Sequence, residues 1–308
     1  MKSKYYLIFL FFLTGACSEE FDPYYQIQDI RLLGIQANPP TLLPGERSRI
    51  KPLVYKSDES EVSYQWTWCP LSSGSSDSYE CSITYEELSQ QLPEGLTILP
   101  YDLGQTEEID FVYPIPAPLV DAFCEALVTQ SENLPDFIEL PSCTYGLPIH
   151  IILSISQGDQ KIISVKKVNL ATQETQTNPN QNPSTPKIYI SSDSVNETEL
   201  TADKRVYLQR EADYNFQVKI DESSSETYTD EEDEVQKESI VVSWFVESGE
   251  LESTRTGYYP DQNSWQDLKN KFKTPSFKEY ESDRLKMYVV VRDNRQGMSY
   301  HEYEFYLE

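Results

Sequence analysis

The sequence predicts a mainly β protein that contains two β-sandwich domains. Apolar and polar residues alternate with a period of two in several segments, which is typical of strands with one buried face. Each half of the chain has one such segment with tryptophan near its centre, and a polar stretch separates the halves. A chain of 308 residues also has room for two domains of roughly 100 to 200 residues each.

The first sixteen residues have the order of a secretory signal. Two lysines precede the apolar run 5–13, and three small residues then lead to Cys17. The run is far shorter than the roughly 20 apolar residues that a membrane-spanning helix needs, and acidic residues follow it. Cleavage before Cys17 leaves two alternatives: a lipid-modified N-terminus or an exported chain with an unpaired thiol.

The remaining chain divides at a polar, proline-containing segment, ATQETQTNPNQNPSTP, which has almost nothing apolar to bury. We expect this segment to be an extended, flexible linker. The expected organisation is signal peptide 1–16, tether 17–26, first domain 27–170 with an insertion 70–145, linker 171–186 and second domain 187–308.

The two tryptophan strands are VSYQWTWC and IVVSWFV, and each is followed later by two apolar strands near the end of its domain. A buried tryptophan on a middle strand, packed by a late hairpin, resembles the immunoglobulin-like sandwich. The resemblance implies that Trp68 and Trp244 occupy equivalent positions. In the second domain the late hairpin turns at DNRQG, where Asn294 and Gly297 suit a turn.

The insertion is too long for a hairpin and contains two predicted helices. Thr84 and Glu87 have the spacing of a capping box, which marks the start of one helix. In the second helix, Leu119, Phe123 and Leu127 recur every four residues, so we expect this stripe to face the core.

Four cysteines follow Cys17, and an even number in an exported chain indicates two disulfides among three possible connectivities. We favour the pairs that close the shortest loops. The rival interpretation is a zinc site, but no pair has CxxC spacing and the chain has only two histidines. The favoured pairs are Cys69 with Cys81 and Cys124 with Cys143.

The net charge of −26 argues against binding to nucleic acid or to anionic lipid headgroups. Part of this charge lies in the run DESSSETYTDEEDEV, which precedes the second tryptophan strand. Its carboxylates are candidate calcium ligands, although the loop lacks the glycine-bearing spacing of an EF-hand. The alternative is a solvated loop. The candidate ligands are Asp221, Asp230, Glu231, Glu232 and Asp233.

A second candidate site is aromatic. Tyr258, Tyr259 and Trp265 lie in a polar, turn-rich connection, and exposed planar rings can stack on the apolar faces of sugars. The alternative is that Trp265 closes the edge of the sandwich.

No catalytic motif is visible in the sequence. His150 and His301 are distant from each other and from any sequence pattern of a serine or cysteine nucleophile, and phosphate-binding glycine loops are missing. We therefore expect a non-enzymatic protein that needs no cofactor. A carboxylate-dependent hydrolase stays an alternative, and it would require a cleft lined by converging carboxylates.

The segment KYYLIFLFFLTGAC resembles a bacterial lipoprotein signal, and the strands of DIRLLGIQANPPTLLPGERSRIKPLVYK shortly after it resemble surface lipoproteins of predatory and gliding deltaproteobacteria (the myxobacterial type). This resemblance implies that Cys17 carries the lipid. Because Ser18 rather than aspartate follows the cysteine, it implies an outer-membrane location, facing either the periplasm or the cell surface. The expected function is a tethered binding or scaffolding module for an envelope protein or a glycan.

The alternative function is a carbohydrate-binding surface lipoprotein. It is suggested by CSEEF, which resembles the acid-rich surface-export tag of Bacteroidetes lipoproteins.

Overall fold

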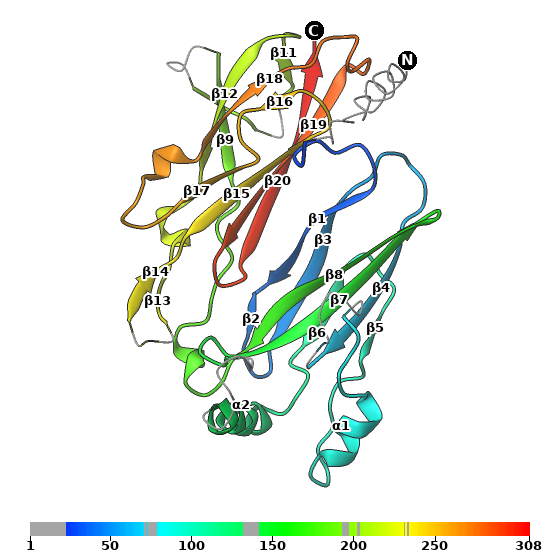
Figure 1. Cartoon of the computed structure of the whole chain (residues 1–308), viewed down its shortest axis with the longest axis vertical. Helices are drawn as coiled ribbons and strands as arrows, with labels where there is room; N and C mark the ends of the chain where they lie inside the picture. The colour runs from blue at the N-terminus through cyan, green and yellow to red at the C-terminus, as the bar shows by residue number, and fades with distance from the viewer. Residues whose placement is uncertain are drawn as a thin grey trace, which may run out of the picture.

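The structure, a computed structural model, describes residues 23–70, 72, 79–131, 142–192, 197–201, 204–230, 232 and 234–308. These residues form two β-sandwiches that lie one above the other in Figure 1, which confirms the predicted fold class. Within the described ranges, no helix is long and apolar enough to cross a membrane. Cys17 and the rest of the predicted signal and tether up to residue 22 lie outside the described residues.

The first sandwich packs a three-stranded sheet on a five-stranded sheet. Neighbouring strands within each sheet pair antiparallel, except that β2 joins β8 in parallel. The three-stranded sheet has the order β1 (Arg31–Asn38), β3 (Arg47–Tyr55) and β6 (Ile109–Val112). The five-stranded sheet has the order β2 (Thr41–Leu42), β8 (Gln160–Leu170), β7 (Leu147–Gln157), β4 (Ser63–Cys69) and β5 (Asp102–Gly104).

The second sandwich has two five-stranded sheets and a separate hairpin. One sheet has the order β10 (Thr198–Glu199), β9 (Lys187–Ser191), β12 (Asp213–Lys219), β18 (Lys269–Lys273) and β16 (Glu250–Leu251). The other has the order β11 (Val206–Leu208), β20 (Met298–Leu307), β19 (Arg284–Asp293), β15 (Ile240–Val246) and β17 (Arg255–Tyr258). The hairpin consists of β13 (Thr227–Thr229) and β14 (Val235–Lys237). Among the described residues, the 3-10 turn η2 (Thr175–Thr177) lies between the domains, and η3 (Glu222–Ser224) and η4 (Trp265–Asp267) lie in the second domain.

Tryptophans fill both cores, as the alternation predicts. Trp66, Trp68 and Trp244 are each 0% exposed, so neither tryptophan of the first domain lies deeper than the other. Trp244 lies opposite Val289, four residues before the end of β19, and Trp66 lies opposite Leu153, four residues before the end of β7. By this register Trp66, rather than the expected Trp68, is the closer counterpart of Trp244.

The insertion contains both predicted helices, α1 (Tyr85–Gln91) and α2 (Ala117–Ser131). Thr84 and Glu87 form the predicted capping box. The prediction for α2 holds at Leu127, which packs against the core, but not at Phe123, which is 50% exposed, while Val120 and Cys124 are buried. The buried side of the helix carries Cys124, which is bonded to Cys143.

Both predicted disulfides are present. Cys69 is bonded to Cys81, with Cα atoms 5.7 Å apart, and Cys124 is bonded to Cys143, with Cα atoms 5.8 Å apart. The first joins β4 to the segment before α1, and the second joins α2 to the segment before β7. The disulfides therefore fasten the insertion to the sandwich, as expected.

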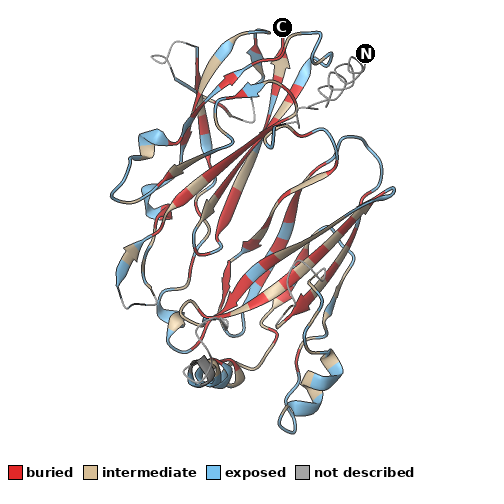
Figure 2. Ribbon diagram, in the orientation of Figure 1, coloured by how far each residue is buried: buried red, intermediate tan, exposed pale blue. Residues whose placement is uncertain are grey.

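The two sandwiches share a third apolar cluster, which buries outward-facing side chains of both domains (Figure 2). Leu33 and Leu53 come from the first domain, and Phe245 and Val290 come from the second. At Gly34 the strands approach so closely that a Cβ atom would lie 2.6 Å from the sulfur of Met298. The domains are therefore packed together and not merely joined by the chain.

The first described residues also cross to the second domain. The Ile27 N–H donates to the carbonyl of Val246 at 3.0 Å, and the Val246 N–H donates to Tyr25 at 2.9 Å. The guanidinium of Arg31 lies 4.3 Å from the centre of the Tyr24 ring. The beginning of the first domain is thereby held against the end of β15 in the second domain.

The segment 171–186, which we expected to be a flexible linker, forms hydrogen bonds to both domains. Asn182 donates to the carbonyl of Ala37 at 2.8 Å and accepts a hydrogen bond from the Met298 N–H at 2.8 Å. The Ser184 N–H donates to Ser224 at 2.9 Å. Its polar side chains thus bond to both domains, which composition alone does not reveal.

Candidate functional site

The predicted aromatic site does not form a shared platform. Tyr258 ends β17 and is only 9% exposed, and its ring stacks on that of Trp265 with centroids 4.0 Å apart. Tyr259 is 40% exposed, and its ring lies next to Gly257. Because Tyr258 and Trp265 cover each other, the structure is closer to the alternative in which Trp265 closes the edge of the sandwich.

The acidic run contributes to a turn. Asp230 accepts hydrogen bonds from the N–H groups of Glu232 at 3.1 Å and Glu234 at 2.8 Å, and from Gln236 at 2.8 Å. Asp221 is separate from this turn and precedes η3. Glu231 and Asp233, two of the five expected calcium ligands, lie outside the described residues. Among the residues that are described, no three His, Cys, Asp or Glu side chains are grouped closely enough to hold a metal.

One histidine has a partner that the sequence did not show. The Ser72 hydroxyl lies 2.6 Å from Nδ1 of His150, a contact that no sequence motif indicates. Ser72 forms an isolated bridge with Cys81, whose disulfide partner Cys69 pairs with His150 across the strands. The Ser72–His150 pair therefore belongs to the disulfide-fastened base of the insertion. Burial lowers the pKa of His150 below its ordinary value.

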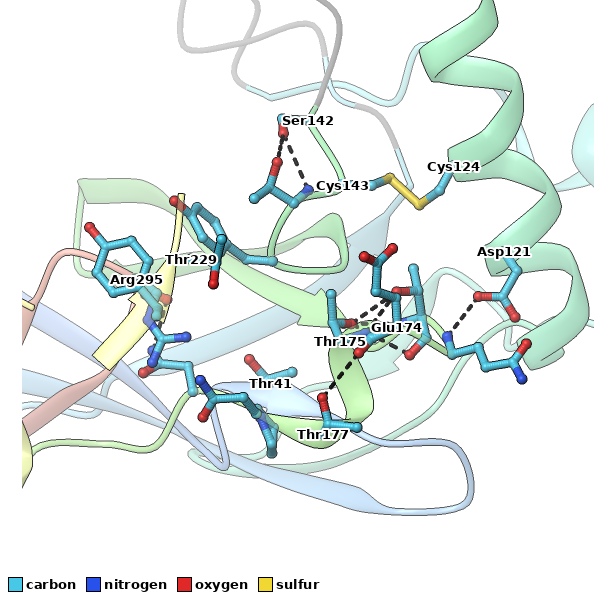
Figure 3. A pocket seen from close by; sticks show the side chains of 18 of the residues that line it. Thr41, Asp121, Cys124, Ser142, Cys143, Glu174, Thr175, Thr177, Thr229 and Arg295 are labelled. Carbon is cyan, nitrogen blue, oxygen red and sulfur yellow. Dashed lines mark hydrogen bonds between the residues drawn. A yellow bond between two sulfur atoms is a disulfide. The ribbon is translucent and has the colours of Figure 1, made fainter. Parts of the chain in front are cut away.

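A large hollow lies between the two domains (Figure 3), and Asp230, one of the expected calcium ligands, is among the residues that line it. We call it the interdomain cleft, and its volume is about 960 Å³. Its walls are α2, the strand β2, the segment before β7, the segment 171–186 (the connecting segment), the hairpin β13–β14 and the turn after β19. The lining residues are Thr41, Asp121, Cys124, Glu125, Leu127, Ser142, Cys143, Thr144, Tyr145, Thr172, Gln173, Glu174, Thr175, Thr177, Asn178, Pro179, Asn180, Tyr228, Thr229, Asp230 and Arg295.

Hydrogen bonds hold the side of the cleft that belongs to the first domain. Asp121 of α2 accepts the Gln173 N–H at 2.8 Å, so the helix and the connecting segment are attached to each other. Thr172 and Thr175 bond through their hydroxyl groups at 3.0 Å, which closes the turn η2. Figure 3 shows Asp121 and Cys124 on α2 on one side of the cleft and Arg295 on the other.

The opposite side is built around the buried guanidinium of Arg295, whose side chain is 3% exposed. It donates to Glu238 at 2.5 Å and to Glu226 at 2.8 Å. Burial and the negative charge of Asp293 raise the pKa of Glu238 to about 7, and burial also raises the pKa of Glu226. This network fixes the hairpin β13–β14 relative to the turn after β19.

Two tyrosine rings meet at the cleft. Tyr145 precedes β7 and Tyr228 lies in β13, and their centroids are 5.6 Å apart with an edge-to-face angle of 79°. The guanidinium of Arg295 lies 5.0 Å from the centre of the Tyr228 ring. The Tyr228 hydroxyl accepts a hydrogen bond from Asn294 at 2.8 Å. Each ring thus comes from a different domain, and the pair bridges them.

Sequence analysis missed this cleft because its residues come from distant parts of the chain. Thr41 and Arg295 are separated by most of the two domains, and hydroxyl and amide residues carry no motif. The segment 171–186 did give a signal, since it is unusually rich in Thr, Asn and Gln, but this composition was attributed to a linker.

Comparisons with known proteins find similar solved structures but no family. No family model matches the chain, and no curated protein matches it. A chimeric titin Z1Z2-Z1Z2 tandem functionalised with a GRGDS peptide from fibronectin is 10% identical, with a TM-score of 0.24 over 91% of this chain and 99% of that one.

Two further structures match over about half of their own length. PcdhgB3 EC1-4 is 9% identical, with a TM-score of 0.23 over 91% of this chain and 49% of that chain. A structure concerned with Dscam isoform specificity is 11% identical, with a TM-score of 0.19 over 90% of this chain and 51% of that chain. Such low TM-scores carry no argument, and the fold assignment rests on the sheets described above.

Proposed function

We propose that this chain is a non-catalytic binding module, tethered to the outer membrane through a lipid on Cys17, and that the interdomain cleft is its binding site. The observation that carries the proposal is that both domains and the connecting segment build one cleft of about 960 Å³. Ligand sites commonly occupy such clefts at domain boundaries. The shared apolar cluster and the Asn182 bonds hold the walls in place before any ligand arrives.

The tether is supported by the order of the first sixteen residues and by the acidic surface. A net charge of −26 opposes adsorption to anionic headgroups, so membrane attachment would have to come from the lipid. Several acyl chains, each contributing roughly 0.8 kcal/mol per buried methylene, would make the attachment effectively permanent.

The tether is tested by replacing Cys17→Ala and measuring the protein in membrane and soluble fractions, with Cys17→Ser as the matched variant. We expect both variants to leave the membrane fraction and to lose labelling by a fatty-acid analogue. Unchanged membrane retention of both variants would overturn the proposed anchor. Protease treatment of intact cells then distinguishes a surface-exposed module from a periplasmic one.

The non-catalytic part of the proposal is supported by the state of the carboxylates. The cleft does bring several together, and a hydrolase would need one with a raised pKa to act as the acid. Burial raises the pKa of Asp230, but hydrogen bonds from Glu234 and Gln236 bring it below its ordinary value. The described carboxyl groups near the cleft whose pKa values are raised all accept hydrogen bonds from the backbone or side chain of Arg295. They therefore hold the wall of the cleft together. These are Glu226, Glu238 and Asp293.

A second candidate function, carbohydrate binding, is favoured by a hollow of about 800 Å³ on the outer face of β9, β12 and β18. Tyr189, Gln217 and Trp265 line it, which supplies rings and an amide of the kind that contact sugars. The test is a glycan array with Tyr189→Ala, which we expect to lose binding. Tyr207→Ala, which removes a 52% exposed ring from the other sheet, is the matched control. An array without any bound glycan would reject this function.

A further inference from the structure

We infer that the interdomain cleft binds a lysine or arginine side chain of an extended segment of a partner protein. This inference rests on the proposed function, because it names the class of ligand that the same cleft takes. Four kinds of observation carry it: the charge of the lining, a buried acceptor without a donor, the tyrosine pair and the size of the cleft.

The lining is negatively charged. It contains four carboxylates and one guanidinium, and that guanidinium already bonds to Glu226 and Glu238 in the wall behind it. The carboxylates of the lining therefore lack a compensating cation among the residues that line the cleft. A cationic group would be attracted into this field, and an anionic one would be repelled. The four carboxylates are those of Asp121, Glu125, Glu174 and Asp230.

The lining also contains an orphan hydrogen-bond acceptor. Asn180 is 2% exposed, and its Oδ1 atom has no donor among the described residues. Its Nδ2 atom donates to the carbonyl of Arg295 at 2.9 Å and to Asp293 at 3.4 Å, which fixes the orientation of the amide. A buried acceptor without a partner is unfavourable, so a ligand that brings an N–H donor to it gains by satisfying it.

The tyrosine rings suit the same kind of ligand. The guanidinium of Arg295 lies 5.0 Å from the centre of the Tyr228 ring, so this ring already contacts one cation. Tyr145 meets Tyr228 edge to face and adds a second ring to the cleft. Cations within about 6 Å of an aromatic ring centre are attracted by its electron-rich face.

The size and the neutral part of the lining indicate a peptide. A volume of about 960 Å³ lies at the upper end of the range for sites that enclose whole small molecules, and no described group of side chains could hold a metal ion. Hydroxyl groups of Thr175, Thr177 and Thr229 line the cleft and can donate to or accept from a peptide backbone. A metal ion alone would not form hydrogen bonds with these hydroxyl groups along the cleft.

The test uses the full chain carrying Cys17→Ala, so that it is soluble, and a fluorescent peptide of alternating lysine and serine. We expect saturable binding by anisotropy, and weaker binding when salt rises from about 20 mM to about 300 mM because the Debye length shortens.

Asp121→Asn combined with Glu174→Gln should weaken binding about fivefold, as expected for two exposed charge pairs. The control is Glu59→Gln with Asp159→Asn, which makes the same charge change away from the cleft; Asp159 follows the far end of β7. It should leave binding unchanged.

A second measurement locates the peptide. In an NMR titration we expect the side-chain amide of Asn180 and the backbone amides of Thr175 and Thr229 to shift. Equal binding of a glutamine–serine peptide would overturn the inference while leaving the cleft as a binding site. Equal weakening by the control pair, shifts confined to other surfaces, tighter binding of free spermidine than of the peptide, or no binding of any probe would each also overturn it. If the tether test fails while the peptide binds, only the membrane part of the proposed function is lost.

Discussion

The two sandwiches bury tryptophan at comparable positions but hold their neighbouring loops by different means. In the first domain, the indole of Trp66 donates to the carbonyl of Thr106 at 2.8 Å, and disulfides fasten the surrounding insertion. In the second domain, the indole of Trp244 donates to the Thr256 hydroxyl at 3.0 Å. There, ion pairs between Arg295 and the carboxylates of Glu226 and Glu238 hold the neighbouring hairpin.

This difference has consequences for what each domain tolerates. A disulfide acts mainly by restricting the unfolded chain and responds to reductant. A buried ion network depends on the protonation of its carboxyl groups. The cleft has one wall of each kind, so changes to the disulfide and to the ion network should affect the two domains separately.

The largest expected effect comes from the tryptophans. Trp244→Ala should lower the free energy of unfolding by about 3 to 5 kcal/mol, because it leaves a cavity in a packed core. Trp66→Ala should cost a similar amount if the two positions are equivalent. Urea unfolding followed by circular dichroism measures both. A cost for Trp66→Ala less than half of that for Trp244→Ala would contradict the equivalence.

The next effect concerns the disulfide at α2. Cys124→Ser with Cys143→Ser should destabilise the first domain by about 3 kcal/mol, the value expected for opening a loop of this length, which spans 19 positions. Calorimetry with and without reductant measures the loss, and the reductant should have no further effect on transitions that belong to the second domain. A shift of the second-domain transition by the same amount would show that the two domains unfold as one unit.

A smaller, pH-dependent effect concerns Glu238. Its pKa is raised to about 7 from an ordinary 4.5, mainly by burial, so between these values the folded chain holds a proton that the unfolded chain releases. The stability contributed by this group is complete below about pH 4.5 and is lost as the pH rises through about 7. Glu238→Gln should flatten the decline of Tm in this window. Identical pH profiles for the variant and the parent would refute the assignment.

The smallest effect concerns the contact between the domains. Gly34→Ala places a methyl group against Met298, which is a flexible side chain, so we expect a loss of about 1 kcal/mol. Combining it with Met298→Ala should cost less than the sum of the single changes, because the clash disappears. Strict additivity in chemical denaturation would indicate that the two residues do not meet.

Much of each domain was predictable because strands and short loops are encoded locally. The period-two alternation of β4 and β15 identified both buried faces, and Thr84 with Glu87 identified the start of α1. The disulfides were predictable from the number and spacing of the cysteines. The buried side of α2 was predictable only in part, because the spacing of apolar residues identified Leu127 but not that Phe123 is exposed, which depends on how the helix packs on the sandwich.

By itself, the amino-acid sequence determined the strands, the fastened insertion and the two separate cores, since each depends on residues that are near in the chain or on simple periodicity. Only the tertiary structure decided that the outward faces of β1 and β19 pack together, and that Gln36 donates to the carbonyl of Met298 at 2.8 Å. These contacts join residues that are 262 positions apart. The cleft followed from that packing, because its carboxylates, tyrosines and buried amide become neighbours only when the two domains and the segment between them are brought together.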